Sequence, residues 1–196
     1  MAHYFDERPS VASDVAVVDV ALPDVAFTMT TDRGVFSHGH LDTGTSLLLR
    51  EAPAPAATGD LLDLGSGTGA MALTMALRSP AARVWAVDVN ARALELTAAN
   101  AARNAVTVHA VPPGDVPEDV RFSTIWSNPP IRIGKEALHD LLLTWLPRLA
   151  PGGRMVMVVG KNLGADSLQR WLGEQGWPTT RLASHKGFRV LETRRG

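Results

Sequence analysis

The chain contains no cysteine, a single tyrosine and few aromatic residues, which make up 6% of its 196 residues. Without cysteine, neither disulfide bonds nor cysteine-ligated zinc sites can form. The sequence also lacks a secretory signal and an apolar run long enough to cross a bilayer, so we expect a cytoplasmic protein without membrane contacts. A formal net charge of −1 excludes a strong positive field over the whole molecule. Any contact with nucleic acid therefore has to be local or shared with a partner.

What is present is an ordinary globular composition, with 45% hydrophobic and 20% charged residues. A chain of this length can bury a sizeable core in one domain. We therefore expect residues 1–196 to form a single domain, in which residues 1–36 are a β-rich cap and residues 37–196 the main fold. Two strand-like runs, residues 15–22 and 25–31, flank a Pro-Asp turn signal and predict the strands of that cap.

From Asp60 onward, strand-like apolar runs alternate with helical segments, which is typical of parallel βαβ units. The expected strands are residues 61–64, 84–88, 107–111, 124–127 and 154–159. The expected helices are residues 70–78, 91–104, 135–149 and 166–174. The last part of the chain predicts a β-hairpin, with arms at residues 181–184 and 188–194.

A glycine-rich segment follows the first of these strands: residues 61–69 read Leu-Leu-Asp-Leu-Gly-Ser-Gly-Thr-Gly. Glycine lacks a Cβ and tolerates positive φ, so this turn lets a ligand approach the backbone closely at a helix N-terminus. The spacing Gly65-x-Gly67-x-Gly69 is one residue tighter than the Gly-x-Gly-x-x-Gly of dinucleotide-binding proteins. Asp63 lies just before it, in the strand.

Asp88 ends the next predicted strand. A carboxylate at that position can accept hydrogen bonds from both ribose hydroxyls of an adenosyl group. It could instead cap the following helix, but Asn90 is better placed for that role. Asp88 therefore predicts a nucleoside ligand without deciding which cofactor carries it.

The stretch Ser-Asn-Pro-Pro-Ile at residues 127–131 lies at the carboxyl edge of the predicted sheet, where ligands bind in open α/β folds. Pro129 and Pro130 stiffen the loop. The side-chain carbonyl of Asn128 and the backbone carbonyl of Pro129 can then accept hydrogen bonds from one exocyclic amine. Two fixed acceptors favour the pyramidal, more nucleophilic form of an amine whose lone pair is otherwise delocalised. An ordinary Asn-Pro turn is the alternative; the position downstream of Asp63 and Asp88 favours the functional interpretation.

Two other features are less specific. His38 and His40 could form a metal pair, but no cysteine or carboxylate cluster accompanies them, and we expect no metal. Arg132 flanks the Asn-Pro-Pro loop and either contacts a phosphate or simply solvates the loop.

Together these motifs resemble the methyltransferase small domain family, of which bacterial ribosomal RNA guanine-N2 methyltransferases are the best-known members. The resemblance covers most of the chain, and its pieces are specific jointly. They are His3-Tyr4-Phe5, Gly34-Val35-Phe36-Ser37, Leu41-Asp42-x-Gly44-Thr45-x-Leu47-Leu48-Leu49, Asp63-Leu64-Gly65-x-Gly67-x-Gly69, Asp88-Val89-Asn90-x-Arg92-Ala93, Asn128-Pro129-Pro130 and Lys186-Gly187-Phe188-Arg189-Val190-Leu191.

The resemblance implies an α/β, Rossmann-like class I methyltransferase fold. Such a fold has a mostly parallel seven-stranded sheet with helices on both faces, here with a small N-terminal β extension. The implied cofactor is S-adenosylmethionine, bordered at its adenine by residues 111–115. The cofactor-binding residues it implies are Asp42, Thr45, Asp63, Gly65, Gly67, Asp88 and Asn128. The expected catalytic residues are Asn128, Pro129 and Pro130, and the expected substrate-binding residues are Phe36, Ile131 and Arg132.

The sequence departs from the family pattern at three points. Ile131 stands where Phe or Tyr usually follows Asn-Pro-Pro and can stack on a flat base. Ser123 follows Phe122 where an acid is usual. The duplicated N-terminal domain that ribosomal RNA members often carry has no counterpart in this sequence.

We expect a methyltransferase acting on an exocyclic amine, with guanine N2 in ribosomal RNA as the favoured substrate and ribosomal RNA or a ribosomal subunit as partner. Adenine N6 and a protein glutamine amide are alternative acceptors. Two other classes stay open: a module that binds the cofactor without turnover, and a nicotinamide oxidoreductase, which the tight glycine spacing disfavours. The sequence predicts no oligomeric state.

Overall fold

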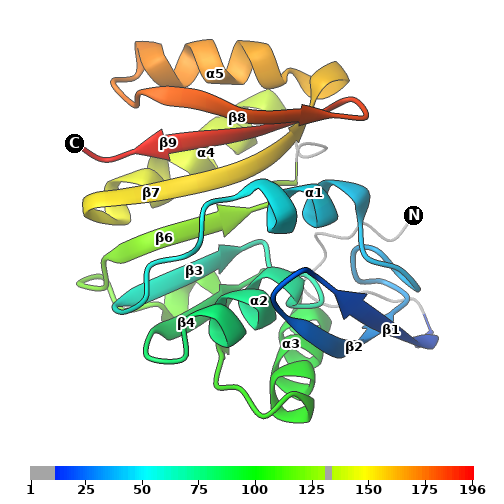
Figure 1. The fold of residues 1–196 in the computed structure, drawn as a ribbon. Coiled ribbons are helices and arrows are strands. Elements are labelled where there is room, and N and C mark those ends of the chain that lie inside the picture. The colour runs from blue at the N-terminus through cyan, green and yellow to red at the C-terminus, as the bar shows by residue number, and fades with distance from the viewer. Residues whose placement is uncertain (1–11, 131–133) are drawn as a thin grey trace.

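A seven-stranded sheet forms the centre of the computed structural model, which describes residues 12–130 and 134–196 (Figure 1). Its strands are β3 (Asp60–Leu64), β4 (Arg83–Val87), β5 (His109–Val111), β6 (Phe122–Ser127), β7 (Leu149–Gly160), β8 (Thr179–His185) and β9 (Phe188–Arg194). The spatial order is β5-β4-β3-β6-β7-β9-β8. β3 to β7 pair in parallel, whereas β9 runs antiparallel to both of its neighbours. The predicted mostly parallel seven-stranded sheet is confirmed.

Helices cover both faces of this sheet. They are α1 (Thr43–Glu51), α2 (Ala70–Arg78), α3 (Ala91–Arg103), α4 (Lys135–Trp145) and α5 (Ala165–Glu174). Along β7, Met155 and Met157 join a core cluster with side chains of α4 and α5. Val156 and Val158 point the other way and join a cluster with side chains of α1 and α2. Burial on both faces explains why β7 reads as a continuous apolar run rather than an alternating one.

A small hairpin of β1 (Val15–Ala21) and β2 (Ala26–Asp32) forms a separate two-stranded sheet. It lies beside α3, which supplies hydrogen bonds that a neighbouring strand would otherwise make (Figure 1). The Asn100 side chain accepts from the Thr30 amide at 2.7 Å and donates to the Thr30 carbonyl at 2.9 Å. Asn104, one helical turn later, makes the same pair of bonds to Thr28. Asn100 also donates to the Thr68 carbonyl at 3.0 Å, so it joins the hairpin to the glycine-rich loop.

The prediction of a single helix over residues 135–149 is wrong at its C-terminal end. α4 ends earlier, a 3₁₀ turn η3 (Leu146–Arg148) follows, and Leu149 already belongs to β7. Pro147 has no N–H to continue the α-helical hydrogen-bond ladder, which explains the early end. β7 is correspondingly longer than the strand predicted over residues 154–159.

No helix in the described part of the chain is both long and apolar enough to span a bilayer.

The shortest strand of the large sheet is β5, which begins two residues later than predicted. Two further short 3₁₀ turns, η1 (Pro113–Asp115) and η4 (Lys161–Leu163), follow β5 and β7 respectively.

The parallel strands at the centre of the sheet end at one level. Leu64 at the end of β3 pairs with Val87 of β4 on one side and with Ser127 of β6 on the other. The glycine-rich loop, Asp88 and Asn128 come directly after these three residues. All of them therefore emerge at the same edge of the sheet.

Asn100→Ala is expected to lower the free energy of unfolding by about 2–4 kcal/mol, because it leaves backbone groups of Thr30 and Thr68 without their partners. Urea unfolding followed by circular dichroism measures the change. Glu95→Ala, an exposed substitution on the same helix, is the control and should change the value by less than about 0.5 kcal/mol. Equal stability of the two variants would contradict the role of Asn100 in joining hairpin and loop.

Candidate active site

The glycine-rich loop between β3 and α2 depends on backbone conformations that favour glycine. Gly65, Gly67 and Gly69 have φ angles of +76°, +53° and +86°. A Cβ on Gly69 would lie 2.8 Å from the side chain of Thr97, so a larger residue cannot fit there without displacing α3. A Cβ on Gly65 would meet nothing within 4 Å. The loop is thus tightly supported on one side and open on the side of Gly65.

Most amides of this loop are occupied by acceptors of the protein itself. Those of Gly65 and Ser66 donate to the Val87 carbonyl at 2.8 and 3.1 Å, and the Gly67 amide donates to Asp88 Oδ2 at 2.8 Å. The Gly69 amide donates to the Ser66 carbonyl at 2.8 Å. In dinucleotide-binding proteins the corresponding loop and helix N-terminus receive a pyrophosphate. Here these four amides are not available to one.

Asp63 lies beneath the loop and is 1% exposed. Its Oδ2 accepts from the Ala72 amide at 2.9 Å, and its Oδ1 has no partner among the described residues. Burial raises the pKa of the Asp63 carboxyl to about 7, and the nearby Asp88 carboxylate adds to the rise. A buried acid with one unused oxygen at a pocket wall is typical of a ligand site.

Asp88 turns both carboxylate oxygens toward backbone amides. Oδ2 accepts from Gly67, and Oδ1 accepts from Asn90 at 2.9 Å. Asn90 is the N-cap of α3, with its side chain accepting from the amides of Arg92 and Ala93. The prediction that Asn90 rather than Asp88 caps this helix is confirmed. Burial raises the pKa of the Asp88 carboxyl, although its hydrogen bonds to backbone amides oppose the shift.

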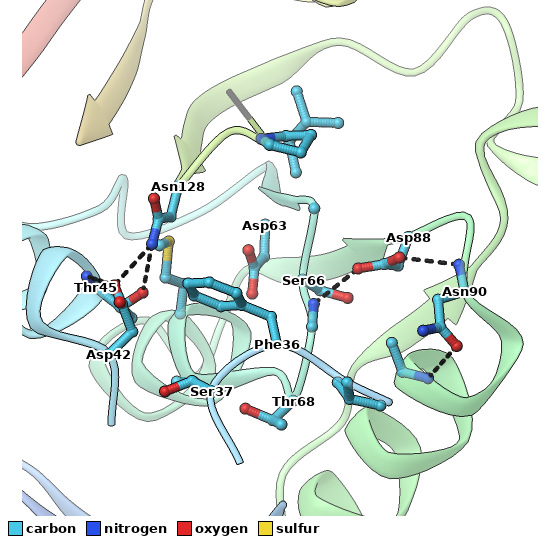
Figure 2. Close-up of a pocket in the computed structure, with 18 of the residues that line it drawn as sticks. Phe36, Ser37, Asp42, Thr45, Asp63, Ser66, Thr68, Asp88, Asn90 and Asn128 are labelled. Atoms are coloured by element: carbon cyan, nitrogen blue, oxygen red, sulfur yellow. Dashed lines mark hydrogen bonds between the residues drawn. The ribbon is translucent and has the colours of Figure 1, made fainter. Parts of the chain in front are cut away.

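Asn128 begins the loop after β6, and Ser127 before it is anchored by a hydrogen bond to the Leu64 carbonyl at 2.7 Å. The Asn128 side chain donates through Nδ2 to Asp42 Oδ2 at 2.8 Å and to Thr45 Oγ1 at 3.1 Å (Figure 2). Its Oδ1 has no hydrogen-bond partner in the described part of the chain and remains available as an acceptor. The resemblance assigned Asp42 and Asn128 to the same cofactor site but did not predict a hydrogen bond between them.

One pocket brings together most of the predicted site residues (Figure 2). In Figure 2 the ring of Phe36 lies between Asn128 on one side and Ser66 and Asp88 on the other. Phe36 is 46% exposed. The predicted residues that line the pocket are Phe36, Asp42, Thr45, Asp63, Gly65, Gly67, Asp88, Asn128 and Pro130. Pro129 is buried beside it, and Ile131 and Arg132 fall outside the described residues.

The structure adds lining residues that sequence reasoning did not single out. Ser66 has a buried hydroxyl without a partner among the described residues. Val89 directly follows Asp88 and is 46% exposed, which is unusual for a valine at the end of a buried strand. Pro113 also lines the pocket; it lies in the segment, residues 111–115, that the resemblance predicted to border the adenine. The sequence signal that could have identified Val89 was an apolar residue directly after the strand-terminal acid.

The two histidines of the preceding loop are bonded to backbone groups. His38 Nε2 lies 2.6 Å from the Asp14 carbonyl oxygen, and His40 Nδ1 lies 3.0 Å from the His38 carbonyl oxygen. Among the residues that the structure describes, no group of three or more His, Cys, Asp or Glu is arranged to hold a metal ion.

Comparison with known proteins identifies the family. The profile of the methyltransferase small domain family matches residues 26–192. The chain is 32% identical, over 98% of both chains, to the uncharacterized protein YbxB of Bacillus subtilis. It is 36% identical to ribosomal RNA small subunit methyltransferase C of Pseudomonas aeruginosa, over 83% of this chain and 49% of the relative.

Among solved structures, the 16S rRNA N2 G1207 methyltransferase of T. thermophilus in complex with AdoMet and guanosine superposes with a TM-score of 0.78. The two share 24% sequence identity over 96% of this chain and 52% of that chain, so they share the fold. The chain spans about half the length of these ribosomal RNA methyltransferases, but nearly all of the Bacillus protein. Since the family profile covers most of its length, the chain belongs to the methyltransferase small domain family.

Proposed function

We propose that this protein is an S-adenosylmethionine-dependent methyltransferase that acts on an exocyclic amine, guanine N2 in ribosomal RNA. The observation that carries the proposal is the hydrogen bonding of the Asn128 side chain. Its Nδ2 is held by Asp42 and Thr45, and its Oδ1 has no partner among the described residues, in the same pocket as the glycine-rich loop and Asp88. An amine acceptor and a nucleoside-binding acid thus share one cavity.

The pocket fits S-adenosylmethionine by its own chemistry. Asp88, fixed by two backbone amides, would accept the ribose hydroxyls through its remaining lone pairs. The open space beside Gly65 would admit the methionine end of the cofactor close to the backbone. Asp63 lines the same pocket, and its Oδ1, which has no partner among the described residues, would interact with the positive charge of the cofactor. When bound, S-adenosylmethionine supplies a methyl group activated by a sulfonium.

The Asn-Pro-Pro loop would hold the acceptor. Asn128 Oδ1 and the Pro129 carbonyl would each accept one N–H of the target amine, which favours a pyramidal nitrogen whose lone pair is no longer delocalised into the base. The nitrogen is then oriented for attack on the methyl group, and orientation supplies much of the rate. The methylated nitrogen carries a positive charge and would then lose one proton to water.

Phe36 would recognise the flat part of the substrate. Its exposed ring lies in the pocket near Asn128, and stacking on aromatic rings is a common way to bind an unpaired base. This would compensate for Ile131, which cannot stack as an aromatic residue does at that position. Arg132 would contact a phosphate of the same RNA.

The choice of ribosomal RNA is supported by the names of the relatives, several of which are ribosomal RNA small subunit methyltransferase C. The chain spans about half the length of those relatives. We propose that its partner is ribosomal RNA or a ribosomal subunit and that it acts in the cytoplasm. We also propose that residues 1–196 act as a single domain, with residues 1–36 as a cap on the core formed by residues 37–196.

Asp88→Ala is expected to weaken S-adenosylmethionine binding by about 10- to 100-fold, as for the loss of hydrogen bonds to a charged group. Isothermal titration calorimetry with S-adenosylmethionine, S-adenosylhomocysteine and NAD measures it. The wild type should bind the two sulfur ligands and not NAD. Asp19→Ala, an exposed acid on the hairpin, is the control. If the wild type binds NAD and neither sulfur ligand, the proposed function fails.

Asn128→Ala is expected to reduce methyl transfer by about 10²- to 10³-fold, the usual effect of removing one group that stabilises a transition state. Binding of S-adenosylmethionine should change little. Tritium transfer to 16S ribosomal RNA, total RNA and protein extracts measures activity and identifies the acceptor. Asn162→Ala, which changes an exposed asparagine, is the matched control.

The position of the tritium label identifies the methyl acceptor. Label in guanine N2 of ribosomal RNA supports the proposal, whereas label in adenine or in protein would show that a different acceptor is the substrate. Cofactor binding without transfer to any extract would instead make the chain a non-catalytic module.

Asp63 predicts a pH dependence of stability in the absence of cofactor. Its folded-state pKa of about 7 lies above the ordinary value of 3.8, so the folded state retains a proton that the unfolded state releases. The free energy of unfolding should therefore fall by a few kcal/mol as the pH rises from about 4 to about 7. Asp63→Asn should remove this part of the decline. Urea unfolding of both proteins across that range measures it, and parallel curves would contradict the assignment.

A further inference from the structure

Asp42 occupies the N-cap of α1 and does more than cap the helix. Its Oδ2 accepts from the Thr45 amide at 2.8 Å, which is the capping bond. The same oxygen accepts from Asn128 Nδ2 at 2.8 Å. One carboxylate oxygen therefore joins the start of α1 to a loop 86 residues further along the chain.

The side-chain amide of Asn128 has two orientations, which exchange its oxygen and its NH₂ group. Acceptance of a hydrogen bond from a target amine requires the oxygen to face the substrate. An ionised carboxylate can only accept hydrogen bonds. Turning the amide over would place Asn128 Oδ1 against Asp42 Oδ2, so the carboxylate selects the productive orientation. The Thr45 hydroxyl accepts from the same NH₂ group at 3.1 Å, but a hydroxyl can also donate and does not select by itself.

We propose that Asp42 is a positioning residue for methyl transfer, which holds the Asn128 oxygen toward the substrate amine and makes it a stronger acceptor. The inference rests on the proposed function and goes beyond it, because the sequence assigned Asp42 to cofactor binding. The bond is charge-assisted, and such bonds are about twice as strong as neutral ones. Donation to a carboxylate increases the electron density on the amide oxygen, which favours hydrogen bonds from an amine that is losing its lone pair to a new bond.

The surroundings of Asp42 keep this arrangement rigid. Thr45 is 7% exposed, and Leu48 and Leu49 on the same helix are fully buried in the core cluster of α1, α2 and the sheet. Gly44 leaves room for the carboxylate: a Cβ there would lie 3.1 Å from Asp42 Oδ2 and 3.2 Å from the Phe188 ring. The acceptor of the Asn128 bond is therefore supplied by a packed helix rather than by a loose loop.

The first test compares Asp42→Ser with Asp42→Asn. Serine still caps a helix but is too short to reach Asn128, whereas asparagine keeps one oxygen for both bonds. We expect Asp42→Ser to lower kcat by about 10- to 100-fold, the range for a hydrogen bond to a charged group. Asp42→Asn should lose less. The dissociation constant of S-adenosylmethionine, measured by calorimetry, should change by less than about threefold in both. Thr43→Val, an exposed neighbour at the same helix end, is the control.

The second test uses an exchange of charge. Asn128→Asp alone places two carboxylates at hydrogen-bond distance, where like charges oppose each other. Adding Asp42→Asn to it restores a donor–acceptor pair with the donor on the other residue. We therefore expect Asp42→Asn to lower transfer in the wild-type background and to raise it severalfold in the Asn128→Asp background. A capping or cofactor-binding role for Asp42 does not predict this reversal.

The outcomes distinguish the two proposals. If Asp42→Ser weakens cofactor binding as much as it lowers kcat, or if the effect of Asp42→Asn has the same sign in both backgrounds, the positioning role is wrong. If Asn128→Ala retains wild-type transfer, the acceptor site itself is misplaced and the proposed function fails with it. Loss of transfer in Asn128→Ala together with full activity in Asp42→Ser overturns only the inference about Asp42.

Discussion

Parallel pairing of β3 with β4 and β6 is the constraint on which the site depends. Because Leu64, Val87 and Ser127 are in register, the three segments that follow them begin at one edge of the sheet. Their functional groups are the glycine-rich loop, Asp88 and Asn128. A shift of one strand by one residue would turn its side chains to the opposite face and separate these groups. The sheet is buried on both faces by helices, and that burial makes such a shift costly.

The polar groups around the loop form a support that the hydrophobic core does not supply. Thr97 donates to the Gly67 carbonyl at 3.2 Å, and Asn100 donates to the Thr68 carbonyl. Both side chains come from α3, whose position is also fixed by the hairpin through Asn100 and Asn104. The loop is therefore held in place by side chains that are not among the residues lining the pocket. Preorganisation of this kind reduces the cost of binding. Two buried polar atoms at the loop, Asp63 Oδ1 and the Ser66 hydroxyl oxygen, have no partner among the described residues.

The hydrogen bonds of the glycine-rich loop distinguish a dinucleotide site from an S-adenosylmethionine site. A dinucleotide needs loop amides for its pyrophosphate, but in this chain four of them bond to Val87, Asp88 and Ser66. The occupied amides agree with the tight glycine spacing and disfavour the nicotinamide alternative that the sequence left open. Asp88 alone could not make that distinction, because a ribose is common to both cofactors.

The sequence by itself determined the order of strands and helices, the places where the loops turn, and the acid and amide at the strand ends. These follow from local causes: apolar runs, glycines that need positive φ, and prolines that stiffen a turn. Pro147 was a local signal too, and the predicted helix over residues 135–149 overran it. The predicted C-terminal hairpin forms the end of the sheet, in the order β7-β9-β8. No local pattern specifies which of its two strands pairs with β7.

Only the tertiary structure decided which polar groups meet. The bond between Asp42 and Asn128, the bonds from Asn100 to Thr30 and Thr68, and the burial of Asp63 all depend on how a helix packs against the sheet. The residues in each pair lie far apart in the sequence, and their bonds leave no periodic pattern in it. A hydrogen bond tolerates deviations of only a few tenths of an ångström from its preferred donor–acceptor distance of about 2.9 Å, and that precision comes from the packed core as a whole.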